Sequence, residues 1–204
     1  MRGGLTDLAS GFRSEMAAAP VDFRQVVKDL DPTQEILAEV LMEWADLRVA
    51  WRQALPATGG VPRIGPALRL TVPGAAGTGK THTAQIAINQ ARKKFGSYDS
   101  VLTMAFSGVA AANLGSGART IDSIFHTNRD SASDDLAGDQ LDNLVDLLEH
   151  VELLVVDEVS TCGAASLEVE SRRMQQVGRV FWRRRFRSPP PDDMGPFGGA
   201  LACF

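Results

Sequence analysis

The stretch that most constrains this chain is residues 74–81, Gly-Ala-Ala-Gly-Thr-Gly-Lys-Thr. A glycine, four residues, a second glycine, a lysine and a threonine form the pattern of a phosphate-binding loop. The glycines at 74, 77 and 79 allow a tight turn whose backbone N–H groups point inward and form a nest for phosphates. The motif therefore predicts a site for the phosphates of a nucleotide, and it fits ATPases and GTPases alike.

Each position of this loop has an expected role. The lysine carries a mobile positive charge to the β- and γ-phosphates, and the last threonine supplies a hydroxyl for Mg²⁺. That threonine also opens a helix whose N-terminal dipole favours an anion. The expected nucleotide-binding residues are Gly74, Ala75, Ala76, Gly77, Thr78, Gly79, Lys80 and Thr81.

The flanking residues are in the order that such a loop requires. Residues 67–72, Ala-Leu-Arg-Leu-Thr-Val, predict a buried strand, and residues 82–95 predict a helix that Gly96 ends. Further along, residues 100–106 predict a second buried strand, and the apolar spacing over 141–148 predicts another helix. The sequence therefore predicts an α/β fold, a P-loop NTPase with a parallel sheet flanked by helices.

Two carboxylates follow a second apolar run. Residues 151–160, Val-Glu-Leu-Leu-Val-Val-Asp-Glu-Val-Ser, predict a buried strand that delivers Asp157 and Glu158 to the carboxyl edge of the sheet, where α/β proteins bind ligands. Asp157 is expected to hold Mg²⁺, and Glu158 to polarise the water that attacks the γ-phosphate. The alternative is a solvated turn, but the phosphate loop upstream favours the catalytic interpretation.

An amphipathic helix is predicted from residue 31 to about 55. Asp31 is its expected N-cap, Pro32 its first residue, and Gln34 stands at the third position of a capping box. A glutamine just ahead of a phosphate loop could also read the edge of adenine, because its amide both donates and accepts hydrogen bonds. The two roles are compatible.

Composition indicates one globular domain. With 204 residues and 44% hydrophobic content the chain can bury a core, and we assign residues 31–204 to the domain and 1–30 to a loose N-terminal arm. No apolar run approaches the ~20 residues of a membrane-spanning helix, which predicts no membrane partner. Two cysteines and three scattered histidines show no metal spacing, which fits a reducing, intracellular compartment.

The last stretch mixes arginines with aromatic residues. Residues 164–177 predict a helix, and 172–187 hold seven arginines and no acid. The aromatic side chains could face the core while the arginines face water, or the two could bind single-stranded nucleic acid; a nuclear-import patch is a third reading. Residues 198–204 predict a further strand.

Several of these stretches together resemble a known family. Residues 106–115 and 119–125, the Asp-Glu strand and the stretch from Leu30 to Gln34 are similar to motifs of superfamily 1 (RecD-like) DNA helicases of the PIF (petite-integration-frequency) kind. The resemblance implies a RecA-like motor domain in which Gln34 reads adenine. It also implies a single-stranded DNA path along Ser107, Gly108, Thr120 and Ser123. Asp122 stands where the family usually has a histidine, and an acid there would repel phosphate.

The family implies an ATP-dependent 5′-to-3′ DNA helicase in recombination, repair or telomere maintenance, located in the nucleus or mitochondrion if eukaryotic. Its motors carry a second RecA-like domain after this one, so we expect the 204 residues alone to act as the truncated first motor domain, to hydrolyse ATP slowly and not to unwind duplexes. Alternatives are the helicase part of a rolling-circle transposon protein and a nucleotide-binding remnant without helicase activity.

Overall fold

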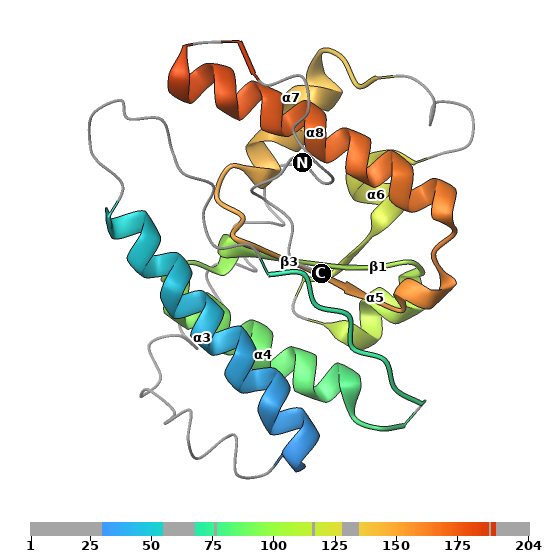
Figure 1. The fold of residues 1–204 in the computed structure, drawn as a ribbon. Coiled ribbons are helices and arrows are strands. Elements are labelled where there is room, and N and C mark those ends of the chain that lie inside the picture. Colours follow the sequence, from blue (N-terminus) through green and yellow to red (C-terminus); the bar gives the residue numbers. More distant parts are fainter. Residues whose placement is uncertain are drawn as a thin grey trace.

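The computed structural model describes residues 30–54, 68–75, 77–115, 117–127, 135–187 and 189–190. A three-stranded sheet lies between two groups of helices (Figure 1). The elements in chain order are α3 (Pro32–Ala54), α4 (Lys80–Phe95), the 3₁₀ turn η1 (Tyr98–Ser100), β1 (Val101–Ala105), α5 (Gly108–Leu114), β2 (Arg119–Thr120), α6 (Ile121–Phe125), α7 (Asp139–Leu148), β3 (Leu153–Asp157), the 3₁₀ turn η2 (Val159–Thr161) and α8 (Ala164–Phe186).

The sheet is parallel, with strand order β2-β1-β3. All five residues of the central strand β1 are buried, as expected for a strand covered by helices on both faces. Its register with β3 runs from Val101 opposite Leu153 to Ala105 opposite Asp157. This register places the predicted carboxylates at the same edge of the sheet as the segment that follows β1.

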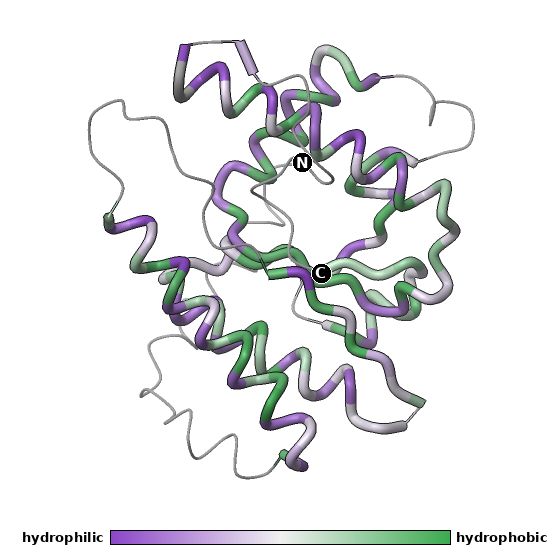
Figure 2. Tube along the Cα trace, viewed as in Figure 1, coloured by the Kyte–Doolittle hydropathy of each residue, from purple (hydrophilic) through white to green (hydrophobic). Residues whose placement is uncertain are grey.

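Alternate strand residues enter two separate cores. Val101 and Leu153 join a cluster with α3 and α4, which holds Leu41, Trp44, Ala45, Ala87, Ile88, Ala91 and Leu114. Leu102 and Leu154 join the cluster on the other face with α6, α7 and α8, which holds Met104, Ile121, Ile124, Phe125, Leu136, Leu144, Val145, Leu148, Val151, Met174 and Val177. Figure 2 shows the central strands hydrophobic along their length, whereas colour alternates along the helices. The predicted fold class, a parallel sheet flanked by helices, is therefore observed.

Most predicted elements are present, and one strand is not. The helices expected over 31–55, 82–95 and around 141–148 and the strands expected over 100–106 and within 151–160 are confirmed as α3, α4, α7, β1 and β3. The strand predicted over 67–72 is wrong, since residues 68–75 form no ladder. Leu68 packs against the α3–α4 core, but Val72 is 44% exposed, so this segment has an apolar contact at one end only.

Two further differences concern helix lengths and faces. Helix α8 continues through the arginine-rich residues to Phe186, because Gly178 alone does not end a helix and no proline occurs before Pro189. On α3, three apolar residues point to solvent: Ile36 is 60% exposed, Val40 38% and Leu47 56%. The buried face of α3 uses Ala38 and Ala45 instead, because small residues allow close contact with α4.

Two predictions lie largely outside the described residues. These are the N-terminal arm, of which only Leu30 is described, buried against Ala38, and the strand over 198–204. Among the described residues, no helix combines the length and apolar character needed to cross a membrane.

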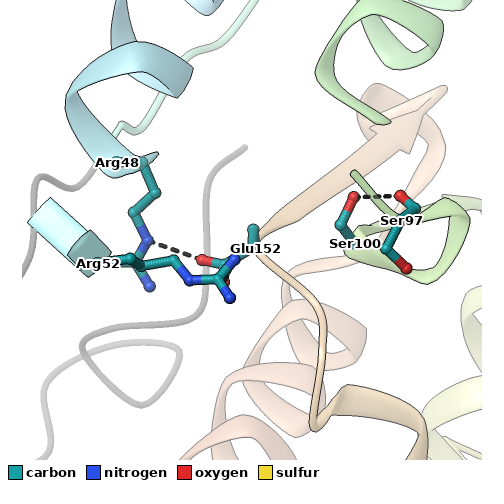
Figure 3. Close-up of polar contacts among 5 residues, drawn as sticks. All are labelled: Arg48, Arg52, Ser97, Ser100 and Glu152. Carbon is teal, nitrogen blue, oxygen red and sulfur yellow. Dashed lines mark hydrogen bonds and ion pairs between the residues drawn. The ribbon is translucent and has the colours of Figure 1, made fainter. Parts of the chain in front are cut away.

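An ion-pair cluster joins α3 to the start of β3 (Figure 3). Arg48 Nε lies 2.8 Å from Glu152 Oε2, and Arg52 Nη1 lies 2.9 Å from Oε1 of the same carboxylate. The backbone N–H of Glu152 also donates to the carbonyl of Ser100, at 2.8 Å. Because Arg48 and Glu152 are nearly buried, solvent screens this contact less than an ion pair on the surface. The cluster ties the last turns of α3 to the amino edge of the sheet.

Candidate nucleotide site

The phosphate loop has the backbone conformation that its glycines predict. Gly77 and Gly79 adopt left-handed φ angles of 79° and 77°, which residues with a side chain rarely adopt. Gly79 is the N-cap of α4 and has no side chain with which to cap the helix. Its first N–H groups are therefore left for an external acceptor such as a phosphate oxygen. A side chain at position 79 would also collide with Gln34, since a Cβ there would lie 2.6 Å from its Nε2.

Lys80 lies folded over the loop it follows. Its ammonium nitrogen donates to the carbonyl oxygens of Gly74 and Ala75, at 2.7 and 2.8 Å. These neutral acceptors hold the charged group at the loop without cancelling its charge. The same ammonium can therefore serve phosphate oxygens that enter the nest.

Thr81 and Asp157 meet across 76 positions of sequence. The Thr81 hydroxyl donates to Asp157 Oδ2 at 3.3 Å, while Asp157 Oδ1 accepts from the backbone N–H of Glu158 at 3.0 Å. A hydroxyl oxygen and a carboxylate oxygen are the hard donors that Mg²⁺ prefers, and Mg²⁺ takes its remaining ligands from phosphates and water. The predicted metal-binding pair is therefore brought together, and its donor set fits a Mg²⁺ ion with a nucleotide.

Glu158 has a strained backbone. Its φ of 60° and ψ of 34° lie in the left-handed region, which a non-glycine residue adopts at a cost of about 1–3 kcal/mol. Thr161 holds this turn, since both its backbone N–H and its hydroxyl donate to the carbonyl of Glu158, at 3.0 and 2.7 Å. Sequence reasoning missed Thr161, although a threonine three residues after a turn residue is a known side-chain turn pattern that could have indicated it.

A pocket of about 340 Å³ opens beside these groups. It is lined by Thr81, Phe106, Ser107, Val109, Ala110, Asn113, Asp157, Glu158 and Thr161. The pocket thus joins the predicted metal-binding pair, the predicted catalytic glutamate and the segment after β1. Gln85 of α4 supports the far wall, because its amide donates to the carbonyls of Asn113 and Leu114.

Gln34 makes the predicted capping box and also contacts the phosphate loop. Its Oε1 accepts from the N–H of Asp31 at 3.2 Å, and Asp31 Oδ1 accepts from the N–H of Gln34 at 3.2 Å. Its Nε2 donates to the carbonyl of Thr78 at 3.0 Å. The amide is therefore next to the nucleotide site, and its role in reading adenine stays a prediction.

The residues expected along the DNA path cap two short helices. Ser107 accepts from the N–H of Ala110 at the start of α5, where Gly108 is the first residue. Thr120 accepts from the N–H of Ser123 at the start of α6, and Ser123 donates its hydroxyl back to the Thr120 carbonyl. Ser107 lines the pocket, whereas Thr120 and Ser123 do not.

Asp122 lies at the start of α6, next to these caps. Its carboxylate accepts a hydrogen bond from the hydroxyl of Thr127. Two carboxylates, Glu170 first and then Asp122, add to the effect of burial in raising the pKa of the Cys162 thiol. Asp122 therefore lies beside the caps expected to contact DNA, and the expected repulsion of a DNA phosphate by this acid stays a prediction.

Comparison with known proteins gives one family and two similar structures. The AAA domain family matches residues 65–181, which include the phosphate loop, both carboxylates and most of α8. One similar structure shows DNA unwinding at forked double-stranded DNA by two coordinating Pif1 helicases, with 26% identity and a TM-score of 0.44. Another is Bacteroides Pif1 bound to single-stranded DNA, with 25% identity and a TM-score of 0.43. Each match covers 63% of this chain and 26% of the other, so the chain matches about a quarter of those structures. No curated protein matches the chain.

Proposed function

This chain belongs to the AAA domain family, whose match spans residues 65–181, and we propose that it is an ATP-hydrolysing motor domain of a DNA helicase. The observation that carries the proposal is the contact between Thr81 and Asp157 on a pocket that Glu158 and Ser107 also line. One pocket therefore joins the groups expected to hydrolyse ATP to the segment expected to touch DNA. The family match and this sheet support the P-loop NTPase fold predicted from sequence.

In the proposed site the phosphate loop binds and orients the nucleotide. The N–H groups at the start of α4 and the ammonium of Lys80 would donate hydrogen bonds to the phosphate oxygens, and Lys80 would leave the carbonyls of Gly74 and Ala75 to do so. Thr81 and Asp157 would hold Mg²⁺, which supplies charge neutralisation between phosphate oxygens. These residues position the substrate and leave proton transfer to another group.

Glu158 is the proposed acceptor of a proton from the attacking water. Glu158 follows Asp157 directly, and its left-handed backbone ends the strand at that point. One of the two carboxylates can ligate a metal while the other faces the pocket that both residues line. A positioned general base contributes roughly 10²–10⁴-fold to a rate.

The proposed link to DNA is the segment after β1. Ser107 and Asn113 line the same pocket as Glu158, and Gln85 ties that segment to α4, which begins at the phosphate loop. A displacement of α5 by a DNA strand would therefore reach the nucleotide through direct contacts. The roles of Ser107, Gly108, Thr120 and Ser123 in binding single-stranded DNA, and of Gln34 in reading adenine, belong to this proposal.

Finer parts of the proposal rest on the sequence resemblance alone. These are 5′-to-3′ movement, a second motor domain as packing partner, work in recombination, repair or telomere maintenance, and a nuclear or mitochondrial location. The slow hydrolysis expected for the 204 residues alone also stays a prediction.

ATP binding and turnover test the proposal directly. Lys80→Ala should weaken Mg-ATP binding roughly tenfold or more, since a charged hydrogen bond contributes about 1.5–3 kcal/mol. Lys93→Ala is the matched control, because Lys93 is an exposed lysine at the opposite end of α4. Glu158→Gln should keep ATP affinity and lose turnover, measured with and without oligothymidine. Equal affinity of the two lysine variants in calorimetry would contradict the assignment of the loop.

A further inference from the structure

The end of α8 carries four arginines that the proposed ATPase site does not use. They are Arg179, Arg183, Arg184 and Arg187, and we refer to them as the α8 arginine surface. The last three are exposed and Arg179 is half-exposed. No ion pair among the described residues involves any of the four, even though α7, which packs on α8, presents exposed aspartates. Their charges are therefore available to a partner.

Packing of the neighbouring residues fixes which way this surface points. Val177 lies in the core beneath α8, and Phe181, one turn later on the same face, packs against that core. Arg179 and Arg183 are four residues apart within α8, so they lie on a common face with about 6 Å of helix rise between them, and Arg187 follows as the C-cap with a left-handed φ of 50°. The aromatic residue Phe181 thus packs against the core, as one of the sequence interpretations expected, while the row of arginines spaced four residues apart is exposed or half-exposed.

Favourable interaction with the helix dipole explains the position of only some of these arginines. Basic residues in the last turn of a helix are stabilised by its negative end, and that effect fades within one turn. Arg187 follows the helix directly, but Arg179 lies about two turns before its end. Residues 171–187 contain no acid, in a chain whose net charge is −4. The concentration of positive charge is therefore local and exceeds what the helix end requires.

The surface lies far from the nucleotide pocket. Helix α8 begins at Ala164, three residues after Thr161 on the pocket wall, and Arg183 comes 19 residues later, about 28 Å along the axis. In Figure 1 the red end of α8 is at the upper left, whereas α5 is at the lower right. An anion held by these arginines is thus separate from any phosphate in the loop.

We propose that the α8 arginine surface binds the phosphate backbone of a nucleic acid strand, as a second contact outside the nucleotide pocket. Guanidinium groups match phosphate geometry and bind it through paired hydrogen bonds. A row of them spaced along one helix face suits a polyanion with regularly repeated charges better than a single small anion. The proposal rests on the proposed function for its choice of DNA as the strand.

Salt dependence of DNA binding tests this contact. The variant Arg183→Ala/Arg184→Ala removes two charges near the end of α8. The control Lys93→Ala removes an exposed charge near the end of α4 that makes no ion pair among the described residues. Affinity for a fluorescent oligothymidine of about 20 nucleotides is measured by anisotropy from about 50 to 200 mM salt. Each phosphate contact to a single strand adds about 0.7 to the slope of log affinity against log salt. The α8 variant should lower that slope by about 1.4, and the α4 variant should leave it unchanged.

Further variants separate charge from folding and from the ATPase. Arg183→Lys/Arg184→Lys should keep the slope, since the charges remain, and unfolding curves of all variants should coincide. Equal slopes for the α8 and α4 alanine variants would overturn the proposal and leave an acidic protein as the remaining class of partner. A wild-type chain that binds no oligothymidine would overturn it as well. Glu158→Gln should lose DNA-stimulated ATP turnover and keep the salt slope of the wild type. The ATPase proposal and the α8 proposal are therefore tested by separate measurements.

Discussion

Thr161→Val should lower ATP turnover without weakening ATP binding. The hydroxyl of Thr161 donates to the carbonyl of Glu158 at 2.7 Å and so helps to hold that residue in the left-handed backbone. Valine keeps the branched shape and the backbone N–H bond at 3.0 Å but loses the hydroxyl. The substitution therefore removes one of two hydrogen bonds that oppose the strain.

The size of the effect follows from that hydrogen bond. A neutral hydrogen bond contributes about 0.5–1.5 kcal/mol, against a left-handed cost of about 1–3 kcal/mol. Losing it should reduce the fraction of molecules with Glu158 correctly placed by roughly two- to tenfold, and kcat by the same factor. ATP affinity should not change, because Lys80 and Thr81 lie on α4 and keep their own contacts.

The assay compares kcat with the dissociation constant of ATP. Thr161→Ser should restore turnover, because serine supplies the same donor. Thr103→Val is the matched control: Thr103 is buried on β1, and its hydroxyl has no partner among the described residues, so its loss should leave kcat unchanged. A kcat for Thr161→Val equal to that of Thr103→Val would refute the positioning role of Thr161.

Two other residues give predictions of different kinds. Gln34→Ala should lower ATP affinity about three- to tenfold and reduce the preference for ATP over GTP, since the amide that touches Thr78 is lost; an unchanged ATP/GTP ratio in competition binding would count against adenine reading. Glu170 is fully buried without a hydrogen-bond partner among the described residues, and burial raises its pKa from 4.5 to about 7. The folded chain thus holds a proton that the unfolded chain releases, so stability is lost as pH rises from about 4.5 through 7, by up to about 3 kcal/mol. Glu170→Gln should therefore be more stable than wild type at pH ~8 and not at pH ~5 in urea unfolding; the same difference at both pH values would refute this.

Local motifs made the site predictable from sequence. The phosphate loop, Lys80, Thr81 and the Asp157–Glu158 pair each follow from a short pattern whose backbone requirement is built into its residues. The contact between Thr81 and Asp157 also followed, because parallel strands deliver their carboxyl ends to one edge.

Features that depend on packing partners were not predictable in the same way. Residues 67–72 have the composition of a strand, but a strand needs a neighbour to accept its hydrogen bonds, and sequence does not say where that neighbour lies. Ile36 and Leu47 fit the helical period of α3, yet the close approach of α4 buries alanines instead. The strand β2 has two residues, too few to form a pattern.

Helix α3 and strand β3 form two sides of a closed ring of contacts. At one corner Gln34 donates a hydrogen bond to the phosphate loop, and at the other Arg48 and Arg52 form ion pairs with Glu152, the residue before β3. The side from Gln34 to Arg48 is about 21 Å long and β3 about 17 Å, so the lengths nearly match. The ring closes where Thr81 meets Asp157. The distance between the phosphate loop and Asp157, the carboxylate proposed to bind Mg²⁺, is therefore set in part by the ion pairs of Glu152 at the opposite edge of the sheet. A change at those ion pairs would alter the geometry of the proposed nucleotide site.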